Sequence, residues 1–379
     1  MATAGCPAWV LFASQGYFGD DSNETSATAF TRGGRTIKAS FFPARPPHPS
    51  NLCVHCPGAA TAEGAPRVLS VAGDLILFRV SINTDGRPLS QVQRDYFIYG
   101  RPRSGRSPQS AAPAPTSRTT RLPVKLPSGE YNLAGHLTTN VVTIGGERGT
   151  MGWVDLWRGI IFCDLLREPL TLRSIPLPLP MTQIIGRTHL GRGMNSRGIG
   201  FVNGAGAGCL KFVELQLDAV DVSDETGFPI LLVKGWSVTT WSNAGMSSRY
   251  EDWQEDLPTP VQAYQIIPDD SAVFSHSQQQ QKLGTGLRLV LPAQGGGYCC
   301  EKAATTTTHS LQKLLVSDPC ASLDGDDVVY LIARPKLYYP KTWILALDMK
   351  KKMLQAVVPF GILEEPDPNV IYCTSTLQH

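Results

Sequence analysis

The chain has 379 residues, of which 42% are hydrophobic and 17% are charged, so a wholly disordered protein is excluded and a sizeable buried core is possible. Its 34 Lys and Arg residues against 32 Asp and Glu leave a net charge of +2, too small to draw the molecule onto nucleic acid or a membrane surface. No apolar run reaches the roughly 18 residues of a transmembrane helix.

The N-terminus carries no sign of a secretory signal. The first charged residue is Asp20, and the apolar run from Ala8 to Ala13 is shorter than the hydrophobic region of a signal peptide. We therefore expect a cytoplasmic or nuclear protein, in which the nine cysteines stay reduced.

The 36 Gly and 29 Pro residues predict many tight turns between short strands. In the first hundred residues, Ala27–Phe30 and Arg35–Phe42 flank Gly33 and Gly34, and Asp74–Ile82 leads to Asp85 and Gly86. These glycine turns predict two β-hairpins. The segment Arg101–Lys125 then carries six basic residues, five prolines and no acid, which predicts a flexible loop or linker.

Strand patterns resume after the linker and continue to the C-terminus. A Trp-Arg-Gly turn at residues 157–159 separates two apolar strands, and a third strand ends in alternating prolines from Pro176 to Pro180. Only Ser310–Val316 has a helical pattern, and Met349–Lys352 is the expected lysine-rich tip of a hairpin. The other expected strands are Asn140–Ile144, Lys211–Leu217, Ile230–Thr240, Leu287–Leu291, Val328–Arg334, Thr342–Asp348 and Met353–Phe360.

These patterns predict an all-β fold, propeller-like, built from short antiparallel strands. Trp153, Trp236 and Trp343 are spaced at about twice the length of a propeller blade, and burial of their indoles is expected to join separate sheets. The alternative is a pair of sandwiches joined by the linker. The expected division is a β region over 1–100, a linker over 101–127 and a β region over 128–379, with both β regions in one fold.

The run from Gly152 to Leu166, with the Pro176–Pro180 segment, resembles the opening of a plant family expanded in grasses, the domain of unknown function 1618. The similarity extends upstream to Trp9–Leu11 and downstream to Trp343–Met349, and the family core corresponds to about residues 153–285. The resemblance implies no established activity. A looser similarity to F-box-associated and kelch-like domains implies a β-propeller that binds partner proteins, although this chain has no helical F-box at its N-terminus.

Three groups of residues are candidate chemical sites. Cys53, His55 and Cys56 are zinc-ligand types, but no second cluster with finger spacing follows, since Cys299, Cys300, His309 and Cys320 fit no such pattern. Asp324–Asp327 is expected to be a solvated turn before a strand rather than a cation site. Glycines between 191 and 208 match no phosphate-binding motif and are expected to form a mobile loop.

Two further groups of residues have more than one interpretation. Lys350, Lys351 and Lys352 resemble a fragment of a nuclear import signal, but three lysines at a hairpin tip are expected to be solvated charge. Cys299 and Cys300 are a candidate redox pair, although adjacent cysteines bridge only with strain.

The sequence contains no recognisable catalytic motif, so we expect no catalytic residue, no metal and no cofactor. The expected function is a non-catalytic protein-interaction module with an unknown protein partner, no nucleic acid and no membrane. Trp157 and Arg158 are the candidate interaction surface, where arginine could stack on an indole; the alternative for Trp157 is a side chain that fills the core. The alternative function is a hydrolase-like enzyme whose site is assembled from distant strands.

Overall fold

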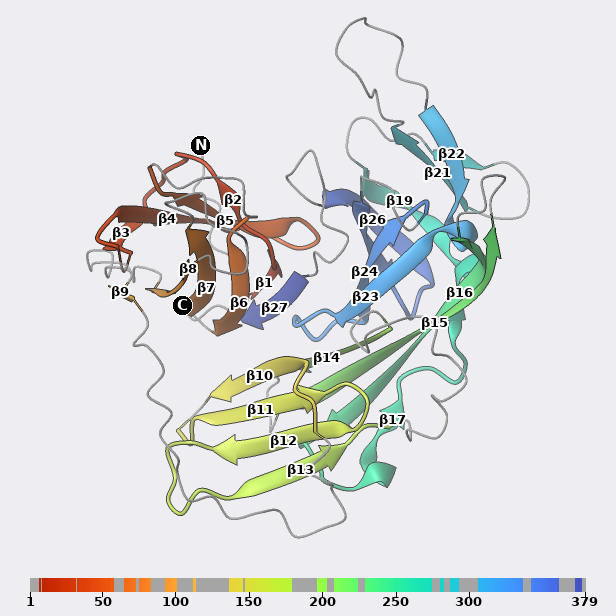
Figure 1. Cartoon of the computed structure of the whole chain (residues 1–379). Helices are drawn as coiled ribbons and strands as arrows, with labels where there is room; N and C mark the ends of the chain where they lie inside the picture. The colour runs from red at the N-terminus through yellow and green to blue at the C-terminus, as the bar shows by residue number, and fades with distance from the viewer. Residues whose placement is uncertain are drawn as a thin grey trace, which may run out of the picture. The chain divides into compact units, whose positions relative to one another are not determined.

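The computed structural model describes most of the strand-forming part of the chain, as residues 7, 9–31, 33–57, 65–72, 75–82, 93–100, 112–113, 136–145, 147–178, 196–202, 208–223, 229–274, 280–282, 287–292, 306–336, 342–360 and 372–376. The chain divides into two compact units, one formed by Met1–Pro123 with Gly361–His379 and the other by Val124–Phe360. Figure 1 shows that β-strands make up both units. The predicted all-β class is therefore confirmed.

The described residues of the first unit form two sheets, one of which combines strands from both ends of the chain. C-terminal β27 pairs with N-terminal β1 in antiparallel register, from Trp9 opposite Thr376 to Ala13 opposite Tyr372. One sheet has the order β27-β1-β5-β4-β3 with β2 beside β5, and the other has the order β6-β7-β8-β9. The strands are β1 (Trp9–Ala13), β2 (Tyr17–Phe18), β3 (Ala27–Phe30), β4 (Thr36–Phe42), β5 (Pro49–His55), β6 (Arg67–Ala72), β7 (Leu75–Ile82), β8 (Gln93–Gly100), β9 (Ala112–Pro113) and β27 (Tyr372–Thr376).

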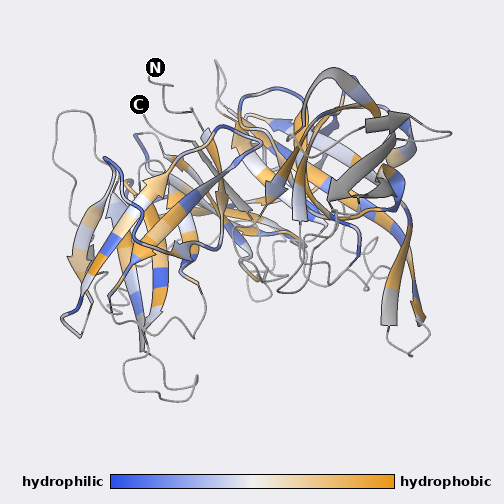
Figure 2. Ribbon diagram, turned by 90° about the horizontal axis from the view of Figure 1, so that it is seen from above, coloured by the Kyte–Doolittle hydropathy of each residue, from blue (hydrophilic) through white to orange (hydrophobic). Residues whose placement is uncertain are grey.

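Side chains from both sheets form one hydrophobic core in the first unit. Phe12 stacks on Phe41 and Phe78 stacks on Phe97, each pair with ring centroids 5.3 Å apart. Figure 2 shows hydrophobic and hydrophilic residues alternating along many strands, as expected where one face of a strand is buried and the other faces water.

Both predicted hairpins of this unit have antiparallel strands. β3 pairs with β4 around the Gly33-Gly34 turn, where Gly34 has a φ of 76° that glycine adopts without steric cost. β7 pairs with β8, while Asp85 and Gly86 lie outside the described residues. So do 101–111 and 114–125 of the predicted linker, within which Ala112–Pro113 forms β9 against β8.

The described residues of the second unit form four sheets. Their strand orders are β10-β11-β12-β13, β14-β15-β16-β17 with β18 beside β16, β19-β26-β25-β24-β23, and β20-β21-β22. The strands are β10 (Asn140–Gly145), β11 (Thr150–Asp155), β12 (Gly159–Asp164), β13 (Leu172–Pro176), β14 (Arg197–Val202), β15 (Cys209–Ser223), β16 (Pro229–Ala244), β17 (Gln254–Glu255), β18 (Val261–Gln262), β19 (Ile267–Phe274), β20 (Gln280–Lys282), β21 (Leu287–Pro292), β22 (Thr306–Ser310), β23 (Leu315–Ala321), β24 (Val328–Arg334), β25 (Thr342–Asp348) and β26 (Met353–Phe360).

Among the described residues, two hydrophobic cores join three of these sheets. The sheet of β10–β13 packs on β14–β16 through side chains that include Val154, Phe162 and Phe212. A larger core joins β15 and β16 to β23–β26 and contains Trp236 and Trp343. Trp153 is only half-buried and belongs to neither core, because strand alternation turns it away from the face on which Val154 is buried.

Two other expectations need correction. Ser310–Val316 forms no α-helix: Leu311–Lys313 is the single 3-10 turn η9, and Leu315 already begins β23. Within the described residues, helical structure is limited to three such turns, the others being η7 (Tyr250–Asp252) and η8 (Ala263–Gln265). The described sheets form no closed ring, so a propeller is not confirmed.

No helix in the described part of the chain combines the length and apolar character needed to cross a bilayer.

Candidate functional site

The Trp-Arg-Gly turn between β11 and β12 is fixed by the carboxylate of Asp155, whose side chain is almost fully buried. Its Oδ1 accepts a hydrogen bond from the Trp157 amide at 2.9 Å, and its Oδ2 accepts one from the Leu137 amide at 2.8 Å. The Arg158 amide donates to the Asp155 carbonyl at 3.0 Å. An aspartate that bonds the amide two residues ahead stabilises a turn locally, so this backbone is held in one conformation.

Arg197, the first residue of β14, supports the turn from beneath. Its Nη1 donates to the Leu156 carbonyl at 3.1 Å and its Nη2 to Glu214 Oε1 at 3.0 Å. The guanidinium carbon lies 5.4 Å from the ring centroid of Trp157 and 5.7 Å from that of Phe212, within the range of cation–π attraction. Because the Arg197 side chain is only 2% exposed, these contacts form away from water and are correspondingly strong.

The stacking arginine is therefore Arg197 and not Arg158, the sequence neighbour of the indole. Leu156 enters the core at 3% exposure, whereas Trp157 and Arg158 remain half-buried. The alternative in which Trp157 fills the core is thus not met, because the turn directs Leu156 inward and leaves the indole half-buried. In the sequence, one feature indicates the role of Arg197: it is a basic residue at the start of an apolar strand, and Glu214, its ion-pair partner, follows 17 residues later.

His136 and Leu137 lie beside this turn. Leu137 is 69% exposed, and its amide and that of Trp157 share the Asp155 carboxylate. The pKa of His136 lies below its ordinary value, chiefly because the ring is partly buried. The charge of Asp155 raises this pKa and that of Arg158 lowers it, and the imidazole is neutral near pH 7. We call His136, Leu137, Trp157 and Arg158 the Trp157 surface.

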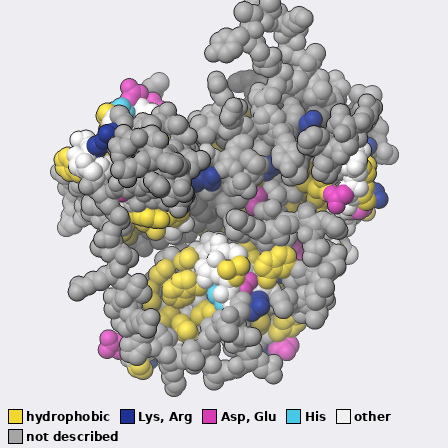
Figure 3. Space-filling view, in the orientation of Figure 1, with side chains coloured by type: hydrophobic (Ala, Val, Ile, Leu, Met, Phe, Trp, Pro, Cys, Tyr) yellow, Lys and Arg dark blue, Asp and Glu magenta, His cyan; other side chains and the backbone are white. Residues whose placement is uncertain are grey.

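The outward face of the same sheet is also apolar. Trp153 lies opposite Val141 on β10 and Ile161 on β12, on the side away from the core residues Val154 and Ile160. Figure 3 shows hydrophobic side chains gathered over the β10–β13 sheet. The Trp157 surface thus lies at the end of a largely apolar sheet face.

The alternating prolines that end β13 are held by two aromatic side chains. Trp253 Nε1 donates to the Pro176 carbonyl at 2.8 Å, and Tyr250 Oη donates to the Pro178 carbonyl. The Leu177 amide, between them, donates to the Arg158 carbonyl at 3.4 Å. These bonds hold the proline segment next to the Trp157 turn.

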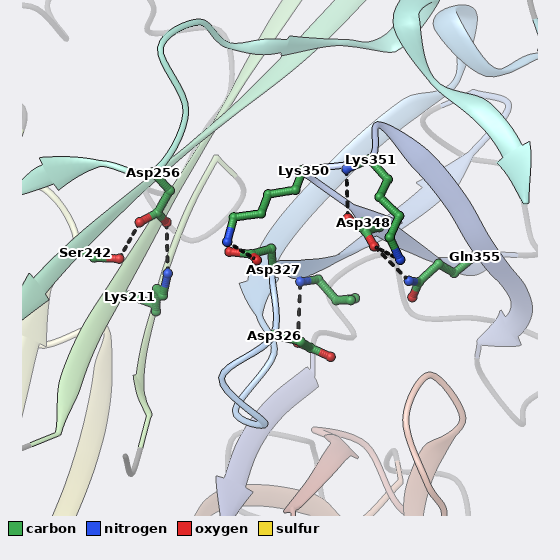
Figure 4. Close-up of polar contacts among 10 residues, drawn as sticks. Lys211, Ser242, Asp256, Asp326, Asp327, Asp348, Lys350, Lys351 and Gln355 are labelled. Carbon is green, nitrogen blue, oxygen red and sulfur yellow. Dashed lines mark hydrogen bonds and ion pairs between the residues drawn. The ribbon is translucent and has the colours of Figure 1, made fainter. Parts of the chain in front are cut away.

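The lysine-rich hairpin tip is solvated, as expected, since the Lys350 and Lys351 side chains are 62% and 68% exposed, and it also forms polar contacts. Lys350 pairs with Asp327 at 2.6 Å and Lys351 with Asp348 at 3.2 Å, while Lys352 Nζ donates to Gln265 Oε1 at 3.1 Å. Figure 4 shows the first two pairs near a separate group in which Asp256 accepts from Lys211 and Ser242. The tip is therefore a set of structural ion pairs on the surface.

The Asp324–Asp327 segment is a turn before β24, as predicted, but its carboxylates are not all solvated. Asp326 Oδ1 accepts a hydrogen bond from the Val328 amide at 3.4 Å, which fixes the start of the strand. Asp327 is half-buried and paired with Lys350, so the segment joins the hairpin tip to β24.

Cys53 and Cys56 are buried thiols near the end of β5, and His55 between them is half-buried. Desolvation raises the pKa of both thiols, which keeps them protonated at neutral pH. In the described part of the chain, no three His, Cys, Asp or Glu side chains are grouped as a metal site. Cys299, Cys300 and the side chain of His309 lie outside that part.

Two glycines of the expected mobile loop, Gly198 and Gly200, are instead strand residues of β14. A Cβ at Gly198 would lie 1.8 Å from the carbonyl oxygen of Pro319, so glycine is needed for β14 to approach β23. Gly208 precedes β15 with a φ of 77°. Glycines 191, 193, 204 and 206 lie outside the described residues.

A family model described as "Protein of unknown function (DUF1618)" matches residues 153–330. No curated protein matches the chain. Among solved structures, the chain is similar to a mannose phosphorylase from Leishmania mexicana in complex with phosphate ion, with 10% identity, 94% of each chain covered and a TM-score of 0.23. A score this low supports no conclusion about fold or function.

Proposed function

We propose that this chain, whose residues 153–330 belong to the DUF1618 family of unknown function, is a non-catalytic protein-interaction module that binds its partner through the Trp157 surface. The observation that carries the proposal is the support of Trp157 by the buried Arg197, with Asp155 holding the turn on which the indole lies.

A rigid aromatic and arginine pair is well suited to protein recognition. Trp and Arg are enriched among the residues that contribute most to binding, and a preformed turn loses little conformational entropy when a partner binds. The exposed Leu137 adds apolar area beside Trp157. Together these side chains combine an apolar anchor with a charged neighbour.

Asp155 and Arg197 have structural roles, and these roles support the same proposal. Both carboxylate oxygens of Asp155 accept backbone amides, and Arg197 is bonded to Leu156 and Glu214. Their polar groups hold the surface in place, which favours binding over catalysis by these two residues.

The test compares proteins captured from extract of cells that express the chain. Trp157→Ala and Arg158→Ala, alone and combined, and Leu137→Ser are expected to lose the specific partner. Leu166→Ser is the matched control, because Leu166 is 75% exposed in the turn after β12, at the opposite end of that strand from Trp157.

Each variant is first checked for folding by near-ultraviolet circular dichroism and thermal unfolding. For the partner so identified, calorimetry is expected to show that Trp157→Ala weakens binding by about 2 kcal/mol or more, as for a central anchor. Partner lists that remain identical in folded Trp157→Ala, Arg158→Ala and Leu137→Ser proteins would remove this surface from the interface.

A cytoplasmic or nuclear location is part of the proposal. The described cysteines Cys53, Cys56, Cys163 and Cys209 are free thiols, as is usual in a reducing compartment. Microscopy of a fluorescent fusion tests the location, and accumulation in the secretory pathway would contradict it.

A further inference from the structure

A second exposed face lies in the first unit, on the outward side of β6, β7 and β8, which are adjacent strands (Figure 1). Cross-strand register places Arg67, Arg79 and Tyr96 in one row, and Ser70, Leu77 and Ile98 in another. Residues directly opposite each other in a sheet share a face. We call Arg67, Leu75, Leu77, Arg79, Tyr96 and Ile98 the Arg79 face.

The opposite side of these strands is buried, so the two sides have distinct roles. Ile76, Phe78, Val80, Phe97 and Tyr99 all lie in the hydrophobic core of the first unit. Packing therefore explains the apolar residues on that side, but not those on the Arg79 face.

Large apolar side chains are unusually exposed on the Arg79 face. Leu75 is 51% exposed, Ile98 is 41% exposed and Tyr96 is 37% exposed. Several such side chains on one sheet face mark a binding surface more often than isolated ones do.

The same face is positively charged. Arg79 on β7 lies directly opposite Arg67 on β6, so the register places two arginines on this face. Among the described outward positions of β6–β8 none is acidic, and Asp95 on β8 is buried at 2% exposure.

We propose that the Arg79 face binds an acidic segment of a partner protein that also carries apolar side chains. Carboxylates of the segment would pair with Arg79, because a guanidinium group forms strong charge-assisted hydrogen bonds with carboxylates. Its leucine-like side chains would cover Leu75, Leu77 and Ile98.

A single-stranded nucleic acid is the competing ligand class. Such ligands are usually held by aromatic side chains on which successive bases stack. Tyr96 is the one aromatic residue at the described outward positions, and the other large apolar side chains there, Leu75, Leu77 and Ile98, are aliphatic. The composition of the face therefore favours a peptide.

This face lies outside residues 153–330 and in a different unit from the Trp157 surface. The two proposals are therefore independent, and variants at one surface leave the other intact.

Fluorescence anisotropy with the full chain tests the inference. The probe is a labelled peptide in which Glu and Leu alternate, compared with a matched peptide that has Lys in place of Glu and with labelled oligo-dT. We expect the Glu-Leu peptide to bind, its affinity to fall as salt is raised, and the Lys peptide not to bind.

Variants then assign the binding to this face. Arg79→Glu and Ile98→Ser are each expected to lower the affinity for the Glu-Leu peptide by about tenfold or more. Arg79→Lys is expected to retain binding, because lysine keeps the positive charge. Arg148→Glu is the control, because Arg148 is 67% exposed in the second unit, and it should change nothing. Circular dichroism and thermal unfolding establish that each variant is folded.

Three results would overturn the proposal: equal binding of the Glu and Lys peptides, unchanged binding by folded Arg79→Glu protein, or oligo-dT binding that Arg79→Glu abolishes. The last result would assign the face to nucleic acid.

Discussion

Arg197 and Arg334 are both buried in the second unit, but their charges are compensated differently. Arg197 has an ionised partner at 3.0 Å, a carbonyl at 3.1 Å and two aromatic rings. Arg334 interacts electrostatically with Asp318, a buried carboxyl whose pKa is raised to about 6 by desolvation. The first arrangement fixes a surface turn, while the second makes stability depend on pH.

The two regions meet where β14 packs on β23. Gly198 follows Arg197, and the residue in closest approach to it is Pro319, which follows Asp318. Asp318 itself has a φ of 52°, uncommon for a residue with a side chain, within an irregular part of the pairing between β23 and β24.

Gly198→Ala is expected to have the largest effect, because it breaks this junction. The new Cβ would lie 1.8 Å from a backbone oxygen of Pro319, so two strands of packed sheets, β14 and β23, must move apart, at a cost of more than about 4 kcal/mol. Urea denaturation followed by circular dichroism measures the loss. Gly200→Ala is the control: its Cβ meets the end of the Leu323 side chain, which can rotate, and about 1 kcal/mol is expected. Equal losses of unfolding free energy in the two variants would contradict the close packing of β14 on β23.

Arg197→Met tests the fully compensated arginine. Removing one member of a buried ion pair is expected to lower the free energy of unfolding by about 3 to 5 kcal/mol, and the double variant with Glu214→Leu should recover part of that loss. Arg173→Met is the matched control, since Arg173 is exposed and its guanidinium lies 5.3 Å from the Phe162 ring centroid. A loss no greater than that of the control would show that Arg197 does not support the turn.

The pH dependence of stability tests the Asp318–Arg334 region. The folded pKa of Asp318, about 6, lies above the ordinary value of 3.8, so its protonated form stabilises the fold below pH 3.8 and this stability is lost as the pH rises through 6. Up to about 3 kcal/mol is expected from this group. The measurement is urea denaturation from pH 4 to pH 7 for the wild type and Asp318→Asn.

The asparagine variant should show a flatter pH profile over that range than the wild type. Asp324→Asn, at an exposed position, should follow the wild type. Parallel curves for the wild type and Asp318→Asn would show that Asp318 titrates normally.

Trp253→Phe has the smallest expected effect. It removes the hydrogen bond from the indole to the Pro176 carbonyl and retains an aromatic ring in the core beside Phe212, so about 1 kcal/mol is expected. Calorimetric unfolding checks this value, with Tyr250→Phe as the more exposed comparison. A larger loss for Tyr250→Phe would reverse the ranking of the two bonds.

The apolar strand patterns could be predicted well from the sequence. The bounds of β24, β25 and β26 match the expected strands, because their long apolar runs end at turn residues. The helix expected over Ser310–Val316 was wrong, since pairing of β23 with β24 outweighs a short local pattern.

The candidate site was only partly predictable. Trp157 and Arg158 stand out in the sequence, and the turn that carries them has the expected position. Arg197 does not stand out, because its contact with Trp157 depends on how two sheets pack. The same holds for Gly198, whose role is set by the approach of Pro319.

The central claim is that a partner protein contacts the turn that Arg197 supports. The most direct measurement places p-benzoylphenylalanine at position 158 or at position 166, irradiates the protein in cell extract and identifies cross-linked proteins by mass spectrometry. We predict one specific cross-linked partner from position 158 and none from position 166. A folded protein that cross-links the same partner from position 166, or gives no cross-link from position 158, would contradict the claim.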